Sequence, residues 1–399
     1  MQSIAWAQPS RLASPGMRRV DVLVVGAGLA GLRTAGLLAR RGLDVLLVDR
    51  RRSLSAGIRT TGIFVRRTLD DFDLPDRLLG PGIRDVLLYP PSRRAPVRLT
   101  SDRDEYRVAD MAGVYEHARH AAEEAGAQVL LGVRYTATTR SAGGGAGRRA
   151  VWLAGAEPVM ARFVVGADGA RSRVASDLGL DVNRRFLVGA EIVHPIAPGR
   201  GAPAFHCVLD PRIAPGYLGW VVDDGRHAHV GVAGYPEAMR SGVRHLLEVF
   251  AEDAPGHAPP TGPVERRGGP IPVGGVLRRL ACPAGLLVGD AAGAVSPLTA
   301  GGLDPCLRMS ELAATVTAEW LRTGDEGVLR QYDGNALRAR FRGRLLLRRA
   351  FAGLRSPAAV EAAVAGLRGR AGRGLAARVL FGDGSFPDVP LKPALTPGR

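Results

Sequence analysis

Apolar residues follow two spacings along this 399-residue chain, and each spacing predicts a different kind of element. Residues 20–25 form an apolar run broken only by Asp21, which is typical of a buried parallel strand. Residues 32–41 have helical spacing that ends at Gly42, and residues 45–48 form a second apolar run. These segments predict a strand–helix–strand unit of about thirty residues.

The same patterns predict further elements downstream. Helices are expected at 115–125 and 303–321, a strand at 128–132, short buried strands at 163–165 and 286–288, and a hairpin at 135–140 and 150–154 around the glycine-rich turn 143–147. Residues 81–104 and 176–279 have another character, since they are rich in Pro and Gly and predict strands and turns. Trp220 and His229 stand on either side of an Asp-Gly turn, which is the signal of a hairpin.

The order of these segments predicts an α/β chain with a Rossmann-like nucleotide-binding domain, interrupted twice by a β-sheet domain. The expected divisions are a disordered leader at 1–16, a discontinuous nucleotide-binding domain at 17–80, 105–175 and 280–330, a β-rich substrate domain at 81–104 and 176–279, and a C-terminal helical segment and tail at 331–399.

The charge is strongly positive, at +16, yet its distribution argues against nucleic acid as a partner. Lys392 is the single lysine, so nearly all basic residues are arginines, and they are scattered without interleaved aromatic residues. The densest run, 338–355, is expected to be a solvated helix; peripheral contact with an anionic membrane is the alternative if the substrate is a lipid.

The cysteines and the hydropathy place the chain in a reducing cytoplasm. The three cysteines are far apart and form no CxxC pair, which indicates neither a disulfide framework nor a zinc site. No run of 18 apolar residues exists, so no membrane span is expected. His117 and His120 have a spacing of three, which favours an exposed helix face over a metal pair.

A glycine motif follows the first strand and indicates a dinucleotide site. In GxGxxG form, Gly26 makes the tight turn, Gly28 lets the backbone approach a pyrophosphate, and Gly31 lets the helix pack on the strand. The helix N-terminus offers free N–H groups to the phosphates. Asp49 closes the second strand, where a carboxylate accepts hydrogen bonds from a ribose hydroxyl.

Two later segments select the dinucleotide. One contains Asp168 and Gly169 after a short strand, and the other runs from Leu286 through Asp290 to Gly301 and Gly302. With the first motif, they resemble the para-hydroxybenzoate-hydroxylase-type flavoprotein superfamily, which binds FAD. The third segment is most similar to the geranylgeranyl reductase branch, and Pro215-Gly216-Tyr217 with Trp220 resembles that branch's substrate-domain strand.

The resemblance implies a role for each matched position. The first-motif glycines would surround the pyrophosphate, Asp49 the adenosine ribose, Val133 the adenine, Asp290 the ribityl chain or the pyrophosphate, and Gly301 and Gly302 the isoalloxazine. Asp168 and Gly169 would support the FAD site, and Arg50, Arg59, Gly289, Pro297 and Leu303 are assigned to it as well. A helix that begins at Leu303 would point about half a positive charge at the ring, which favours an anionic reduced flavin.

Catalytic residues are less sharply indicated. Tyr217, Trp220 and His206 lie on predicted strands of the inserted domain, where the superfamily places substrate, and Cys306 lies one turn into the helix that faces the flavin. Tyr217 could donate a proton and Trp220 could wall an apolar pocket, although ordinary packing explains them nearly as well. The loop at 55–62 lacks the cysteine that reductases of the branch often carry.

We therefore expect a two-domain FAD-dependent oxidoreductase that acts on a hydrophobic organic substrate. The first reading is a reductase or dehydrogenase of an isoprenoid-like C–C unsaturation, with NAD(P)H as a transient electron donor or a separate reductase in that role. One alternative is a monooxygenase that hydroxylates or epoxidises an aromatic compound or a polyketide. Another is a cyclase that uses FAD structurally without net redox chemistry.

Overall fold

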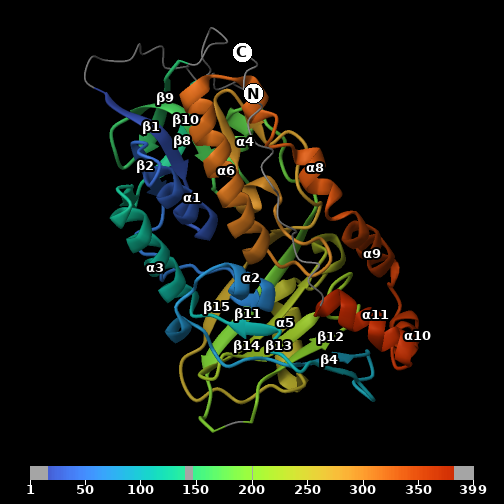
Figure 1. Ribbon diagram of the computed structural model, residues 1–399. Helices are drawn as coiled ribbons and strands as arrows, with labels where there is room; N and C mark the ends of the chain where they lie inside the picture. The colour runs from blue at the N-terminus through green and yellow to red at the C-terminus, as the bar shows by residue number, and fades with distance from the viewer. Residues whose placement is uncertain (1–16, 140–146, 200, 382–399) are drawn as a thin grey trace, which may run out of the picture.

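The computed structural model describes residues 17–139, 147–199 and 201–381. The expected leader at 1–16, most of the glycine-rich turn and the end of the C-terminal tail lie outside the described residues. Two large sheets dominate the described chain and lie toward opposite ends of the molecule, with α6 (Leu303–Thr323) running between them (Figure 1).

The first sheet has eight strands, and its main path is β16-β17-β10-β1-β2-β7. The central neighbours run parallel, as expected for apolar runs that are covered on both faces. The strands are β1 (Arg18–Val25), β2 (Val45–Asp49), β7 (Gln128–Leu131), β8 (Arg134–Thr138), β9 (Arg149–Ala154), β10 (Val159–Gly166), β16 (Ala281–Cys282) and β17 (Gly285–Leu287).

Three helices pack side by side against this sheet. Helix α1 (Leu29–Ala39) contacts α3 (Met111–Glu124) on one side and α6 on the other (Figure 1). The crossing of α1 and α3 is close, because a Cβ at Gly36 would lie 3.2 Å from the Cα of Ala122. Residues of the sheet and the three helices form one buried core.

The predicted elements of this part are confirmed, with shifted ends. The predicted first helix begins three residues earlier, at Leu29, and the predicted helix at 115–125 begins at Met111 because Asp110 caps it. The long helix begins at Leu303, as predicted. The hairpin is formed by β8 and β9, which pair antiparallel.

The second sheet has seven strands in the order β15-β11-β14-β13-β12-β4-β5. Its pairs are antiparallel except for β12 with β4. The strands are β4 (Asp85–Tyr89), β5 (Val97–Thr100), β11 (Phe186–Pro195), β12 (Ala204–Val208), β13 (Gly219–Asp223), β14 (His227–Gly234) and β15 (Glu265–Pro272). The predicted hairpin at the Asp-Gly turn is confirmed as β13 and β14.

One helix corrects the expectation of strands and turns alone in 176–279. Helix α5 (Val243–Asp253) packs on β14 and β11 and buries Leu246, Leu247 and Phe250. Phe250 is completely buried and lies against Gly219, where a Cβ would contact its ring. The helix thus supplies the apolar cover for one face of the second sheet.

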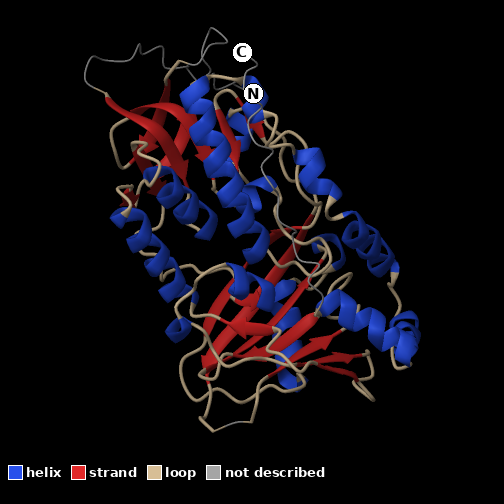
Figure 2. Cartoon of the chain, viewed as in Figure 1, coloured by secondary structure: helices blue, strands red, loops and turns tan. Residues whose placement is uncertain are grey.

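Smaller elements connect and extend the two sheets (Figure 2). A two-stranded sheet joins β3 (Ile63–Val65) to β6 (Tyr106–Val108). The short helices are α2 (Arg66–Asp71), α4 (Arg173–Asp177), α7 (Glu326–Leu329), α8 (Gly334–Ala339), α9 (Arg342–Gly353), α10 (Pro357–Gly366) and α11 (Arg370–Leu380), and the 3-10 turns are η1 (Asp76–Leu78), η2 (Pro236–Ala238) and η3 (Gly289–Ala292). Among the described residues, no helix has both the length and the apolarity needed to cross a bilayer.

Candidate cofactor and active site

The motifs singled out in the sequence meet at one edge of the first sheet. Gly26 follows β1, Asp49 ends β2, Asp168 follows β10 and Asp290 follows β17. Since these four strands are parallel, their carboxyl ends lie at the same edge, which is where open α/β sheets bind ligands.

The first glycines combine tight packing with open space. Gly26 has a φ of +110°, and a Cβ there or at Gly31 would overlap backbone oxygen, of Ala167 and of Gly26 respectively. By contrast, no atom lies within 4 Å of the Cβ position of Gly28, the residue that precedes α1. No side chain caps this helix N-terminus within the described residues, so its first N–H groups face that open space.

Asp49 is held firmly by its neighbours. Its carboxylate accepts hydrogen bonds from the Ala27 N–H at 2.7 Å and from the Arg51 N–H at 2.7 Å. Burial alone would raise the pKa of Asp49, but the hydrogen bonds from Arg51 and Ala27 outweigh it and lower the pKa. Arg50 is exposed beside it, and the N–H of buried Val133 donates to the Asp49 carbonyl.

Asp168 serves the helix that follows it. Its carboxylate accepts hydrogen bonds from the Ser172 hydroxyl at 2.6 Å and from the backbone N–H groups of Arg173 and Val174. Burial of this carboxylate raises its pKa despite these bonds. Gly169 follows in an open left-handed turn with a φ of +85°.

Asp290 lies in a different setting, on the 3-10 turn η3. The residue is exposed, yet it lies deep within the surrounding protein, and this desolvation raises its pKa to about 6. Gly289 presses η3 against the start of α1, since a Cβ there would lie 2.8 Å from the Ala30 Cβ. Asn183 fixes the turn by donating to the Asp290 carbonyl.

The loop from buried Pro297 to Leu303 leads into α6. Gly301 is exposed, and its carbonyl accepts from the Ser296 N–H. Gly302 lies 3.4 Å, measured from its Cβ position, from the Asp290 carboxylate. Two residues later, Asp304 accepts a hydrogen bond from Thr68 of α2, which brings the segment after β3 to this loop.

Tyr217 contacts this loop through its side chain. Its hydroxyl donates to the Thr299 carbonyl at 2.6 Å. Burial raises the pKa of Tyr217, and the guanidinium of Arg348 lies over its ring at 5.3 Å. The phenol therefore remains protonated and joins the second sheet to the loop.

Of the other three candidates, His206 and Trp220 lie on the paired strands β12 and β13 with their side chains on opposite faces, and Cys306 lies on α6. Cys306 is buried on α6, and burial raises its thiol pKa. His206 contacts the Tyr89 hydroxyl at 3.0 Å and lines a small separate hollow, where burial lowers its pKa. Trp220 donates through Nε1 to Glu191 at 3.2 Å. The exposed Arg59 lies beside Gly269 of β15.

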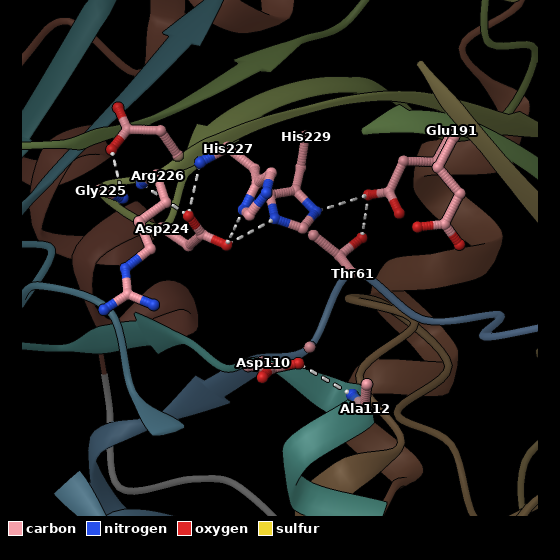
Figure 3. A network of polar contacts seen from close by, with 12 residues as sticks. Thr61, Asp110, Ala112, Glu191, Asp224, Gly225, Arg226, His227 and His229 are labelled. Carbon is pink, nitrogen blue, oxygen red and sulfur yellow. Dashed lines mark hydrogen bonds and ion pairs between the residues drawn. The ribbon is translucent and has the colours of Figure 1, made fainter. Parts of the chain in front are cut away.

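The sequence interpretation missed a polar cluster centred on Glu191 (Figure 3). Besides Trp220, the Thr61 hydroxyl donates to Oε1 of Glu191 at 2.6 Å, and Nδ1 of His229 lies 3.8 Å from the same oxygen. Glu191 and His229 are both almost fully buried. Glu191 stands between apolar residues of β11, and this isolated carboxylate could have indicated the cluster from the sequence. Within the described residues, no His, Cys, Asp and Glu groups gather into a metal site.

The residues at the sheet edge fit FAD. Gly28 leaves room beside an uncapped helix N-terminus, which suits a pyrophosphate. Asp49 supplies a fixed carboxylate at the end of the next strand, and Asp290 supplies one toward α6.

The comparisons with known proteins agree with this geometry. Residues 19–191 match the FAD binding domain family. A digeranylgeranylglycerophospholipid reductase of Methanothermobacter thermautotrophicus is 30% identical over 327 residues, which cover 77% of this chain and 79% of that protein.

Solved structures show the same fold. A geranylgeranyl bacteriochlorophyll reductase-like protein of Thermoplasma acidophilum superposes with a TM-score of 0.76 at 22% identity, covering 92% of this chain and 98% of that one. The p-nitrophenol 4-monooxygenase of Pseudomonas putida gives a TM-score of 0.67 at 18% identity, covering 93% and 99%.

The fold and the glycine-lined sheet edge thus define an FAD-dependent oxidoreductase of the para-hydroxybenzoate-hydroxylase-type flavoprotein superfamily. Within that superfamily, the chain belongs to the geranylgeranyl reductase branch.

Proposed function

We propose that this enzyme reduces carbon–carbon double bonds in a hydrophobic, isoprenoid-like substrate. The observation that carries the proposal is the 30% identity to a digeranylgeranylglycerophospholipid reductase over about three quarters of both chains.

The cofactor placement follows the sheet edge. Gly26, Gly28 and Gly31 would lie along the pyrophosphate, Asp49 and Arg50 at the ribose, Val133 at the adenine, Asp290 at the ribityl chain, and Pro297, Gly301, Gly302 and Leu303 at the isoalloxazine. Asp168, Gly169, Gly289 and Arg59 would support the site from neighbouring turns. Bound FAD supplies hydride-transfer chemistry.

The chain's own residues would shape and dry the space around the reacting carbons. The bond from Tyr217 to the Thr299 carbonyl holds the second sheet against the glycine loop. The positive end of α6 begins at Leu303, directly after the two loop glycines, and would stabilise negative charge there. The residue ranges 17–80, 105–175 and 280–330 would form the FAD domain, with 81–104 and 176–279 over the substrate.

The test is anaerobic turnover. The purified protein, loaded with FAD, is mixed with NADPH, NADH or dithionite while its visible spectrum is followed, and then with a geranylgeranyl lipid. We expect bleaching by a reductant and recovery of the oxidised spectrum on adding the lipid, with a product heavier by two hydrogens per reduced bond. Product formed only with oxygen would instead establish a monooxygenase. Product formed with no reductant would establish the non-redox cyclase.

Contact with a membrane surface is part of the same proposal. Residues 334–380 contain eleven arginines, of which Arg348 is buried, and one acidic residue, Glu361. Helices α8, α9, α10 and α11 follow one another along one side of the molecule (Figure 1), and α9 exposes Leu346 and Leu347 at 62% and 41%. Arginines beside exposed leucines suit the interface of an anionic bilayer, from which a lipid substrate would come.

A further inference from the structure

A row of polar side chains leads from the surface of the second sheet into its interior (Figure 3). It begins at His227, whose side chain is 43% exposed and whose Nδ1 lies 3.3 Å from Oδ2 of Asp224. The same oxygen lies 3.4 Å from Nε2 of His229. Nδ1 of His229 faces Oε1 of Glu191 at 3.8 Å, and Glu191 accepts the Thr61 hydroxyl at 2.6 Å.

The local sequence explains why these groups align. The turn after β13 is closed by Asp224, whose Oδ1 accepts the N–H groups of Arg226 and His227, so its Oδ2 is left for the two histidines. His229 and Gly231 share one face of β14, since side chains alternate along a strand. The missing side chain at Gly231 makes room for the Trp220 ring, which reaches across to Glu191.

The charged groups of the row lie next to groups of opposite charge. Burial alone would lower the pKa of His229, but the carboxylates of Asp224 and Glu191 outweigh it and raise the pKa to about 9. Burial would raise the pKa of Glu191, but His229, Thr61 and Trp220 keep it low. Arg267 of β15 also faces Glu191.

The inner end of the row lies on the chain segment that leads to the proposed flavin end of the site. Thr61 is half-buried and stands two residues before β3, and Arg267 contacts the neighbouring Thr60 carbonyl. The segment continues through β3 into α2, where Thr68 bonds to Asp304, two residues beyond Gly302. Thr61 is therefore on the segment that connects the second sheet to the glycine loop.

We propose that His229, Glu191 and Thr61 form a proton path that delivers a proton to the substrate, while Asp224 and His227 hold His229 in its charged form. This rests on the proposed function, because saturating a double bond requires one proton for each hydride. The N–H bond at Nδ1 of His229 breaks and its proton passes to Glu191. Thr61 gives its hydroxyl proton to the substrate carbon and takes the proton from Glu191. After the product leaves, water beside Thr61 returns a proton through Thr61 and Glu191 to Nδ1 of His229, whose Nε2 stays protonated against Asp224 throughout.

No electrons move along this path, and each group returns to its first state. The electron pair enters the substrate separately, with the hydride of the proposed reduction. The gap of 3.8 Å between His229 and Glu191 must close by about 1 Å for transfer, a tightening that is common when a substrate binds.

The experiment compares Thr61→Val, which keeps the shape but removes the hydroxyl, with Thr61→Ser, which keeps the hydroxyl. Thr136→Val on β8, far from the row along the chain, is the matched control. We expect flavin reduction by the electron donor to be unchanged in all variants. Anaerobic reoxidation by the lipid should slow on the order of a hundredfold in Thr61→Val and Glu191→Gln, and remain near wild type in Thr61→Ser and Thr136→Val.

A second measurement does not depend on turnover. An NMR titration of protein with nitrogen-15-labelled histidine reports the protonation of His229. Its imidazole should stay protonated up to about pH 9 in the wild type and lose its proton at lower pH in Glu191→Gln. A neutral His229 at pH 7, or normal reoxidation by Thr61→Val, would overturn the path. If the wild type reduced no double bond, the proposed function would be wrong, and the proton path would have no reaction to serve.

Discussion

At the residue scale, two glycines of one motif have opposite demands. Gly28 stands in open space with a φ of −73°, so a larger side chain meets no protein atom. Gly31 is packed against the Gly26 carbonyl, so even a methyl group overlaps it. A substitution at Gly28 therefore tests cofactor binding, and a substitution at Gly31 tests the packing of the fold.

We predict that Gly28→Val removes FAD while the protein keeps its stability, because the side chain fills the space expected for the pyrophosphate. Flavin absorbance after purification and urea unfolding of the flavin-free protein measure the two effects. Gly366→Val, another open glycine on α10, is the control and should retain flavin. Gly31→Ala should lower the free energy of unfolding by roughly 2 kcal/mol. Wild-type flavin content in Gly28→Val would contradict this placement.

Asp290 predicts a pH effect in the flavin-free protein. Its pKa is raised to about 6, so ionisation costs more in the folded chain than in the unfolded chain. The wild type should therefore lose stability as the pH rises from about 4 to 6, and Asp290→Asn should lack this loss. Urea unfolding at pH 4.5 and 7.5 tests it. An equal pH dependence in both proteins would show that the carboxylate is fully hydrated.

The sequence predicted the residues that stand next to a strand end, because a short motif and its strand move together. Gly26, Asp49 and Asp290 were found in this way, and the structure places them at one edge. Thr61 and Glu191 were not found, since 130 positions separate them and only the packing of two sheets joins them. Their roles and those of the matched positions remain predictions.

At the element scale, the buried Arg308 of α6 fastens α2 to α6 through Asp71, which is 39% exposed. Arg308 donates to Asp304 at 2.9 Å and to Asp71 at 2.6 Å, and its side chain is 5% exposed. Asp304 also accepts from Thr68, so this pair connects the segment after β3 with the glycine loop.

We predict that Arg308→Met lowers the free energy of unfolding by about 3 kcal/mol, because it leaves Asp304 buried beside fewer donors. The control is Arg322→Met, which breaks an exposed pair with Glu319 and should cost far less stability. Chemical unfolding of both variants gives the comparison. Equal losses would mean that water reaches Asp304.

Elements could be predicted where a long stretch of consecutive residues kept one spacing of apolar positions. The first strand, helix α1 and helix α6 follow from such patterns. The second sheet could not be ordered from sequence, because β4 pairs in parallel with β12 across more than a hundred residues. Helix α5 was missed among glycines and prolines, although Leu246, Leu247 and Phe250 have helical spacing.

At the scale of the whole molecule, the net charge of +16 is unevenly placed. The stretch 334–380 is almost free of acidic residues, whereas arginines of the first sheet and its helices are widely paired, as Arg33 is with Glu311 and Arg162 with Asp21. An unbalanced positive side with exposed leucines attracts an anionic surface and can also insert apolar groups into it.

We predict that the enzyme binds vesicles of phosphatidylglycerol at low salt and much less those of phosphatidylcholine. Binding should weaken as the salt concentration rises, because screening shortens the reach of the arginines. Replacing Arg342 and Arg349 by Gln, or Leu346 and Leu347 by Ser, should each reduce co-sedimentation several-fold, since charge brings α9 to the surface and the leucines hold it there.

The control variant, Arg84→Gln with Arg103→Gln, removes the same charge from the second-sheet side and should bind vesicles as the wild type does. If both double arginine variants lost binding equally, the attraction would belong to net charge alone. DNA serves as a second anionic ligand. If the enzyme bound DNA as well as it bound vesicles, and if the leucine variant lost no more DNA binding than the control variant did, the surface would not be specific for lipid.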